Sequence, residues 1–90
     1  MEFEWDEDKA AANLSKHGVS FDKAKTVFHD PLYVDFFDPD HSHAEERYII
    51  MGQSRRRRLL IVSYMEREDL IRLISAREAT RGERGAYEEG

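Results

Sequence analysis

The sequence predicts an α+β fold in which helices pack on one antiparallel sheet. Three features of the chain support this prediction. Apolar residues recur with helical spacing through most of the first 30 residues. From about residue 32 they alternate as they do in strands, and short polar turns separate the alternating segments. The length of 90 residues suits one small domain, which we expect to occupy residues 1–90.

The N-terminal part predicts a short strand followed by two helices. Residues 2–5 alternate weakly and form the strand. The first helix covers residues 6–17 and ends at Gly18, and the second covers residues 21–29 and ends before Pro31. The expected N-caps and inner faces are Asp6 with Ala10, Asn13, Leu14 and His17 in the first helix, and Ser20 with Phe21, Ala24, Val27 and Phe28 in the second.

Four further strands are expected at residues 32–37, 47–51, 56–65 and 70–76. Their short connections favour an antiparallel meander, because parallel strands need long crossovers. Simple alternation would place one set of side chains on a single face of the last strand: Leu70, Arg72, Ile74 and Ala76.

A short helix is expected at the C-terminal end. Thr80 and Glu83 have the spacing of a capping box, in which each residue bonds the backbone N–H of the other. Gly82 and Gly85 lie inside this helix, and each costs about 1 kcal/mol relative to Ala. We therefore expect the helix to be frayed or to be held by a partner.

Composition excludes several classes of protein. The chain has no Cys, so it contains neither a disulfide framework nor a Cys-ligated metal site. The longest aliphatic run, at residues 59–62, is far shorter than the roughly 20 apolar residues of a membrane helix. The start, MEFEWDEDK, is acidic where a signal peptide is basic, so we expect a cytoplasmic protein.

The net charge of −5 hides an asymmetry, because every arginine lies in the second half of the chain. Arg77 follows the last expected strand and precedes the Thr80 cap. Free N–H groups at a helix start and a guanidinium could bind an anion together there. A surface ion pair with Glu78 or Glu83 is the simpler interpretation of the same spacing.

Two other segments could carry chemistry. Four arginines at residues 55–58 enter the third meander strand, with Arg56 and Arg58 expected on one face and Arg55 and Arg57 on the other. They fit either a phosphate-binding patch or an edge that discourages strand pairing. His17, next to Lys16, could act as a general acid or base, or could simply pack at the helix end.

A metal centre is not expected. One loop gathers carboxylates and imidazoles, but their spacing matches no defined metal site and the loop is rich in turn-forming residues. These residues are Asp38, Asp40, His41, His43 and Glu45. No phosphate-binding loop or dinucleotide fingerprint is present, so no cofactor is predicted.

The whole chain resembles the BrnT toxins of type II toxin–antitoxin modules. The segments that carry the resemblance are EFEWDEDKAAANLSKHGVSF, DPDH, EERYIIMG, RLLIVSY, RLISAREAT and ERGAYE, in this order. The resemblance implies a RelE-like fold and a small ribonuclease that arrests translation. It also implies a BrnA-like ribbon-helix-helix antitoxin as partner, through which alone the chain would reach operator DNA.

Site residues follow from the resemblance where the motifs match. The Arg of R-L-L-I-V is Arg58 and the Arg of I-S-A-R is Arg77, and toxicity in the family depends on such positions. Lys16 and His17 also match the family pattern. Gly82 and Gly85 depart from it, because larger or charged residues are usual there.

Two hypotheses result. In the first, the chain is a metal-independent endoribonuclease in which the ribose 2′-OH attacks the adjacent phosphate. His17 or Lys16 removes the proton, and Arg77 and Arg58 stabilise the transition state. Two further arginines hold the RNA backbone, and unstacked bases contact aromatic rings. The arginines are Arg57 and Arg72, and the aromatic residues are Tyr64 and Tyr87.

In the second hypothesis the chain is a non-catalytic module that binds an acidic antitoxin segment and acts as a co-repressor. The positions of Arg58 and Arg77 discriminate between the two. A shared groove, with His17 or Lys16 nearby, favours catalysis, and opposite faces favour binding.

Overall fold

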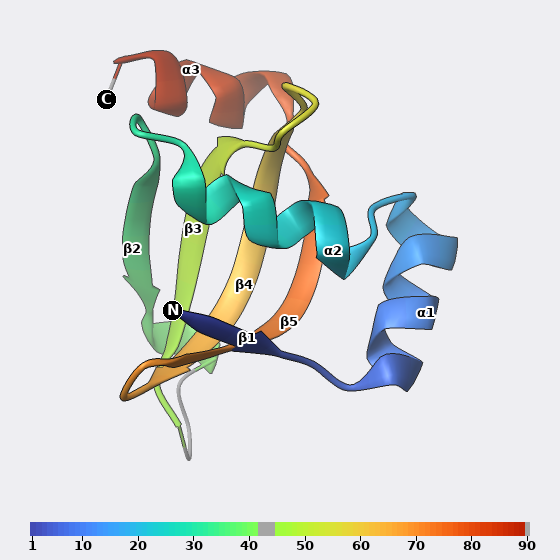
Figure 1. The fold of residues 1–90 in the computed structure, drawn as a ribbon. Helices are drawn as coiled ribbons and strands as arrows, with labels where there is room; N and C mark the ends of the chain where they lie inside the picture. Colours follow the sequence, from blue (N-terminus) through green and yellow to red (C-terminus); the bar gives the residue numbers. More distant parts are fainter. Residues whose placement is uncertain (42–44, 90) are drawn as a thin grey trace.

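The computed structural model describes residues 1–41 and 45–89 and contains a five-stranded sheet with helices on one face and at one end (Figure 1). The elements in chain order are β1 (Glu2–Glu4), α1 (Glu7–His17), α2 (Phe21–Ala24), the 3-10 helix η1 (Lys25–His29), β2 (Val34–Asp38), the 3-10 helix η2 (Pro39–His41), β3 (Arg47–Gln53), β4 (Leu59–Arg67), β5 (Leu70–Glu78) and α3 (Arg81–Glu89). The predicted α+β fold is confirmed. None of the described helices is long and apolar enough to span a membrane.

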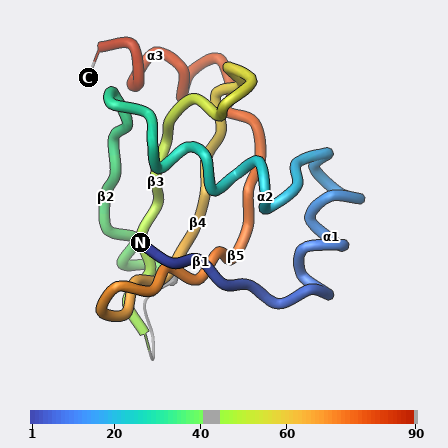
Figure 2. The backbone as a smooth tube through the Cα atoms, in the orientation of Figure 1, coloured from blue at the N-terminus to red at the C-terminus, as the bar shows by residue number. Residues whose placement is uncertain are grey.

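The sheet has the strand order β1-β5-β4-β3-β2. The four strands β2 to β5 form the predicted antiparallel meander, and β1 pairs in parallel with the start of β5. Helices α2 and η1 run across one face of this sheet, and α1 stands at its β5 side (Figure 1). The backbone trace shows α3 crossing the end of the sheet where the β3–β4 turn lies (Figure 2).

The two faces of the sheet differ in how they are covered. We call the face beneath α1, α2 and η1 the helix-covered face, and the other the open face. The helix-covered face holds the main core, which consists of Val19, Phe21, Ala24, Val27, Ile50, Leu60, Val62, Tyr64, Ile71, Leu73 and Ala76. The open face has a smaller cluster of Met51, Leu59 and Ile61, against which Ala79 and Tyr87 pack.

The predicted helix ends are confirmed. The Asp6 carboxylate accepts hydrogen bonds from the backbone N–H groups of Asp8 and Lys9, and Ser20 Oγ accepts one from Lys23. Gly18 ends α1 with a φ of 69°, a left-handed conformation that glycine adopts without a steric penalty. The second helix changes at residue 25 from α to 3-10 geometry.

One residue of the predicted inner face of α1 is wrong, because Leu14 is 52% exposed. Asn13, another residue of the predicted inner face, is buried as expected. Its Nδ2 donates to the carbonyl oxygens of Val19 and Ala76 at 2.9 and 2.8 Å, and its Oδ1 accepts from the Ala76 N–H at 3.0 Å. The amide thus extends the hydrogen bonding of β5 beyond the short β1, which orients the helix so that Leu14 faces solvent.

The predicted start of β4 is also wrong. Arg55 to Arg57 form a turn, closed by the bonds from Ser54 N to Arg58 O and from Arg57 N to Ser54 O, both at 2.8 Å. Arg57 has a φ of 65°, which no extended strand adopts. The expected alternation of these arginines between two strand faces therefore does not occur.

Simple alternation along β5 was expected, but a β-bulge interrupts it, so the expected assignment of side chains to the two faces is wrong. Ser63 pairs with Ser75 and Tyr64 pairs with Leu73, so Ile74 is an extra residue. The side-chain alternation shifts at this point, as it does at bulges in general. Ala76 consequently points into the helix-covered core, whereas Arg77 points to the open face opposite Ile61.

Candidate functional site

A cavity of about 240 Å³ lies on the open face and spans four strands, β2 to β5. Its lining combines two arginines, one aspartate and two serines with three isoleucines: Arg47, Arg77, Asp38, Ser63, Ser75, Ile49, Ile61 and Ile74. Guanidinium groups beside a carboxylate and hydroxyls suit a phosphate-containing ligand, and the isoleucines provide an apolar floor.

Arg77 is held rigidly at this cavity. Its Nη1 and Nη2 each donate to one carboxylate oxygen of Glu83 at 2.8 Å, and Nη1 also donates to the Glu78 carbonyl oxygen at 3.2 Å. A guanidinium has five N–H donors. Within the described part of the chain three are engaged, which leaves two for an anion.

Glu83 performs two functions at once. It accepts from Arg77, and its Oε1 also accepts from the Thr80 N–H at 2.9 Å, while its own N–H donates to Thr80 Oγ1. The predicted capping box is therefore confirmed. The hydrogen bonds from Arg77 and from the Thr80 backbone lower the pKa of Glu83 to about 2, and the same pair raises the pKa of Arg77.

Helix α3 is anchored by this chain's own residues. Tyr87 packs on the open-face cluster, and its hydroxyl donates to Asp30 Oδ2 at 2.5 Å. Burial and this bond raise the pKa of Tyr87 to about 12. Burial alone would raise the pKa of Asp30, but the bonds from Gln53 N–H and Tyr87 lower it. In the structure α3 forms over Arg81–Glu89 with these contacts, and the expectation that it frays or is held by a partner stays a prediction.

Arg58 lies on the other side of the sheet. Its Nε donates to Glu78 Oε1 at 2.8 Å and its Nη1 donates to the Gly18 carbonyl at 3.3 Å. Glu78 pairs with Leu60, a residue of the helix-covered core, whereas Arg77 pairs with Ile61 of the open-face cluster. The structure therefore separates Arg58 and Arg77 by the sheet.

Comparison with known proteins identifies the family of this chain. Residues 5–83 match a protein-family model. That family is described as the ribonuclease toxin, BrnT, of type II toxin–antitoxin systems. The chain belongs to the BrnT family. Membership carries the description of a ribonuclease toxin with an antitoxin partner, which is the family that the sequence motifs indicated.

A solved BrnT structure has the same fold. The 1.1 Å crystal structure of the Brucella abortus ribonuclease toxin BrnT is 23% identical to this chain, with a TM-score of 0.65, over 90% of this chain and 99% of that one. The ORC1-type DNA replication protein 2 of Sulfolobus acidocaldarius is 36% identical over 76 residues, which are 80% of this chain. The match spans only 18% of that protein.

The other predicted residues of this BrnT-family chain are dispersed. Lys16 is exposed and His17 half-buried at the end of α1, one residue before the Gly18 carbonyl that Arg58 contacts. Arg57 is exposed in the β3–β4 turn. Arg72 is on the open face, at the end of β5 far from Arg77, and donates to Glu4 at 2.9 Å.

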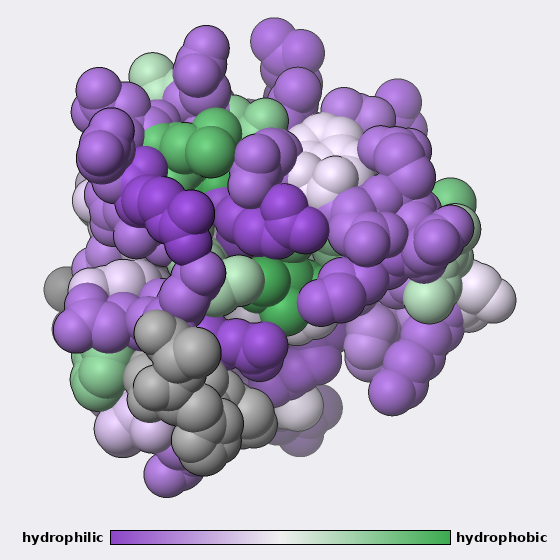
Figure 3. Space-filling view, turned by 90° about the horizontal axis from the view of Figure 1, so that it is seen from below, coloured by the Kyte–Doolittle hydropathy of each residue, from purple (hydrophilic) through white to green (hydrophobic). Residues whose placement is uncertain are grey.

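The surface around Arg72 is largely hydrophilic. A cavity of about 230 Å³ at this end includes Arg72, Arg67 and Glu45, and the last two form an ion pair. The view from below shows mainly hydrophilic atoms here, with small separate apolar groups (Figure 3). This end of the molecule therefore presents charged side chains, most of them paired.

Of the two predicted base-contacting tyrosines, Tyr64 is buried and Tyr87 is half-buried. Tyr64 is 3% exposed, within the helix-covered core, and its ring stacks on Tyr48 with centroids 5.7 Å apart. Burial and the nearby Asp35 carboxylate raise its pKa. Tyr87 is bonded to Asp30, as described above. The prediction for Tyr64 is wrong, because position 64 faces the helices.

The loop of carboxylates and imidazoles is described only in part. Residues 42–44, including His43, lie outside the described residues. Among the described ones, no three His, Cys, Asp or Glu side chains gather as metal ligands would. Asp38 from this loop contributes to the open-face cavity instead.

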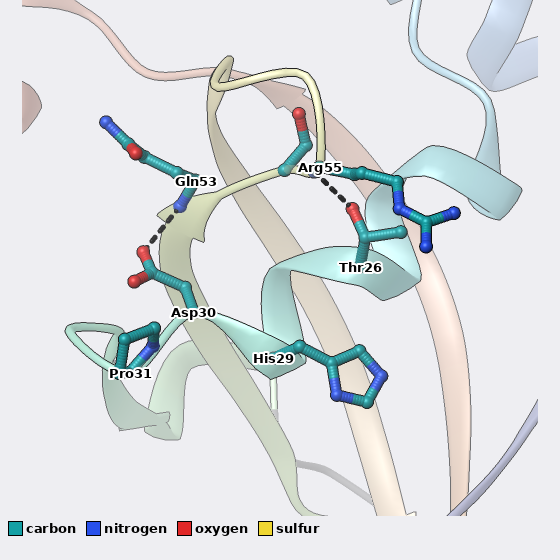
Figure 4. A pocket seen from close by; sticks show the side chains of 7 residues that line it. Thr26, His29, Asp30, Pro31, Gln53 and Arg55 are labelled. Atoms are coloured by element: carbon teal, nitrogen blue, oxygen red, sulfur yellow. Dashed lines mark hydrogen bonds between the residues drawn. The ribbon is translucent and has the colours of Figure 1, made fainter.

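A larger cavity, of about 470 Å³, lies between η1 and the β3–β4 turn (Figure 4). Its polar groups hold the turn in place. Asp30 accepts from the Gln53 N–H and Thr26 Oγ1 accepts from the Arg55 N–H, each at 2.8 Å. The side chains of Gln53 and Arg55 point away from each other, so they do not converge on a ligand (Figure 4).

Sequence reasoning found Arg77 but missed the residues around it. Asp38, Arg47, Ser63 and Ser75 come from four different strands, and no motif joins them. Only the strand register and the bulge at Ile74 bring them to one face.

Proposed function

We propose that this BrnT-family chain is a metal-independent endoribonuclease whose reaction centre is the open-face cavity. The observation that carries the proposal is the convergence of Arg77 and Arg47 with the carboxylate of Asp38 in one cavity. Arg77 is fixed by Glu83 before substrate arrives, and preorganised charge of this kind is what stabilises a transition state most effectively.

The chemistry proposed is attack of the ribose 2′ oxygen on the adjacent phosphorus. Asp38 accepts the proton of the 2′-OH, and the guanidinium groups of Arg77 and Arg47 stabilise the charge that builds on the phosphate oxygens. The bond from phosphorus to the 5′ oxygen breaks, and that oxygen takes a proton from water. The products are a 2′,3′-cyclic phosphate and a 5′-OH end.

The other residues indicated by the family resemblance, Arg58, Lys16 and His17, form the competing location. Arg58 lies beside the end of α1, with His17 or Lys16 as general base. In the present proposal these residues lie outside the reaction centre, and Arg58 stabilises the fold through Glu78 and Gly18. Arg72 extends the open face and Arg57 extends from the turn, and both would contact the RNA backbone.

The partner proposed is a BrnA-like ribbon-helix-helix antitoxin that neutralises the nuclease. RNA cleavage would arrest translation in the cytoplasm, and the chain would contact operator DNA only through the antitoxin. The family description supports an antitoxin as such. The ribbon-helix-helix character and the repression rest on the resemblance of the sequence.

A second function, a non-catalytic co-repressor, is favoured by one observation. Arg58 and Arg77 lie on opposite faces, and each is paired with a carboxylate of the chain. Two separated, paired arginines suit the binding of acidic protein segments as well as they suit phosphate.

Cleavage of total RNA by purified, antitoxin-free protein in excess EDTA tests the proposal. The wild type should yield 2′,3′-cyclic phosphate and 5′-OH ends, and the Arg77→Ala variant should lose nearly all activity. A folded wild type that leaves RNA intact would support the co-repressor. Loss of activity in Arg58→Ala and His17→Ala but not in Arg77→Ala would move the reaction to the end of α1.

A further inference from the structure

We propose that Phe36 is a stacking platform for an unpaired base of single-stranded RNA bound in the open-face cavity. The inference rests on the proposed function, because it names how the same site positions its substrate. Phe36 would act as a positioning residue with little dependence on base identity.

The first argument is the location of the ring. Phe36 pairs with Ile49 of β3, and cross-strand partners share a face of the sheet. Ile49 lines the open-face cavity, as do Asp38 and Arg47, which pair with each other at the next position on this face. The Phe36 side chain therefore projects beside the cavity that holds Arg77.

The second argument is exposure without an internal packing role. Phe36 is 51% exposed, and in the described part of the chain it belongs to neither apolar cluster. Its neighbour Phe37 is 45% exposed but has a packing partner, the Tyr48 ring, at a centroid distance of 5.7 Å on the helix-covered face. Of these two exposed rings, Phe36 is thus the one without a packing role in the described structure.

The third argument is the charge beside the ring. Single-stranded nucleic acid is bound where aromatic rings accept bases and cationic groups accept the backbone. Arg47 and Arg77 line the adjacent cavity, and Arg72 lies further along the same face. An exposed aromatic ring beside these guanidinium groups fits RNA better than it fits a purely apolar protein surface.

Binding of a 2′-O-methyl RNA hexamer, whose blocked 2′ oxygen prevents cleavage, tests the inference. We expect Phe36→Ala to weaken binding by about tenfold or more, which is the usual effect of losing one stacked base. Phe36→Tyr should remain within about threefold of the wild type, because its ring keeps the stacking surface. Phe37→Ala is the matched control, adjacent in sequence and similar in exposure, and should leave binding unchanged.

A second readout does not require removal of the aromatic ring at position 36. In Phe36→Trp the new indole fluorescence should be quenched by the hexamer, whereas in Phe37→Trp it should not. Circular dichroism of each variant confirms the fold.

Equal effects of Phe36→Ala and Phe37→Ala would overturn the inference. So would a Phe36→Ala variant that binds the hexamer normally but no longer binds the antitoxin, because the ring would then be a protein contact. If the wild type binds the hexamer through Phe36 but leaves unmodified RNA intact, the inference stands and the proposed nuclease function fails. If the wild type cleaves RNA and Phe36→Ala binds the hexamer normally, the proposed nuclease function stands and the inference about Phe36 fails.

Discussion

The two faces of the sheet differ in how they are covered and in what their arginines contact. The helix-covered face buries an apolar core beneath α1, α2 and η1, and its arginine, Arg58, fastens the β3–β4 turn to α1 and β5. The open face has a small apolar cluster under α3, and two of its arginines, Arg47 and Arg77, line a cavity. Because side chains alternate along a strand, neighbouring residues sample the two faces and can separate stability from chemistry.

The arginine pair should show the largest difference. Arg77→Ala should lower the single-turnover cleavage rate by about 10²–10³, the usual effect of losing one donor to the transition state. Arg58→Ala should change the rate by less than tenfold and reduce stability by no more than about 1 kcal/mol, because its ion pair is largely exposed. Parallel rate measurements and urea unfolding distinguish the two. Equal rate losses would break the comparison of the faces.

The second-largest difference is expected between substitutions of two adjacent apolar residues, one in each cluster. Leu60→Ala removes a fully buried side chain from the helix-covered core and should cost about 4 kcal/mol of unfolding free energy. Ile61→Ala acts in the smaller cluster and should cost about 2 kcal/mol. Chemical denaturation measures both costs. The folded fraction of Ile61→Ala should also cleave more slowly, because Ile61 forms the cavity floor.

Acid should loosen the open face selectively. The folded pKa of Glu83, about 2, lies below its ordinary value of 4.5. Its contribution to stability is therefore complete above pH 4.5 and is lost as the pH falls from 4.5 toward 2. We expect the amide resonances of α3 to shift in this range before those of α1. In Glu83→Gln this transition of α3 should shrink to the part that Asp30 contributes through its bond from Tyr87, since the amide does not titrate.

The glycines of α3 should give the smallest effect. A methyl group at Gly82 or Gly85 would meet no atom within 4 Å, so Ala fits at both positions. Each substitution should stabilise the helix by about 1 kcal/mol. Thermal unfolding and hydrogen exchange of α3 would detect this gain, and a loss of stability would show that α3 packs differently.

The sequence predicted those parts of the fold that depend on local physics. The caps at Asp6 and Ser20, the left-handed Gly18 and the capping box at Thr80 are bonded as expected. Local signals did not predict the bulge at Ile74, because it arises only when β4 and β5 pair. Yet this bulge turns Arg77 to the open face, so the site could not be assembled from spacing alone.

Only part of the candidate site could be predicted, because strand pairing is not visible in local sequence signals. Arg77 stood out because it follows a strand and precedes a cap. Arg47 and Asp38 become neighbours of the cavity only through the register of β2 and β3. Arg58 directly precedes β4, the strand that contributes Ile61 and Ser63 to the cavity. The turn at residues 54–57 and the ion pair with Glu78 nevertheless direct the Arg58 side chain to the other face.

The central claim is that RNA binds on the open face. The most direct test is NMR mapping of amide shifts in labelled protein titrated with the 2′-O-methyl RNA hexamer. If RNA binds on the open face, the largest shifts should occur at Ile49, Ser63, Ser75 and Arg77, with small changes at the end of α1. Shifts concentrated at His17, Gly18 and Arg58 would contradict it and would place RNA on the rim of the helix-covered face.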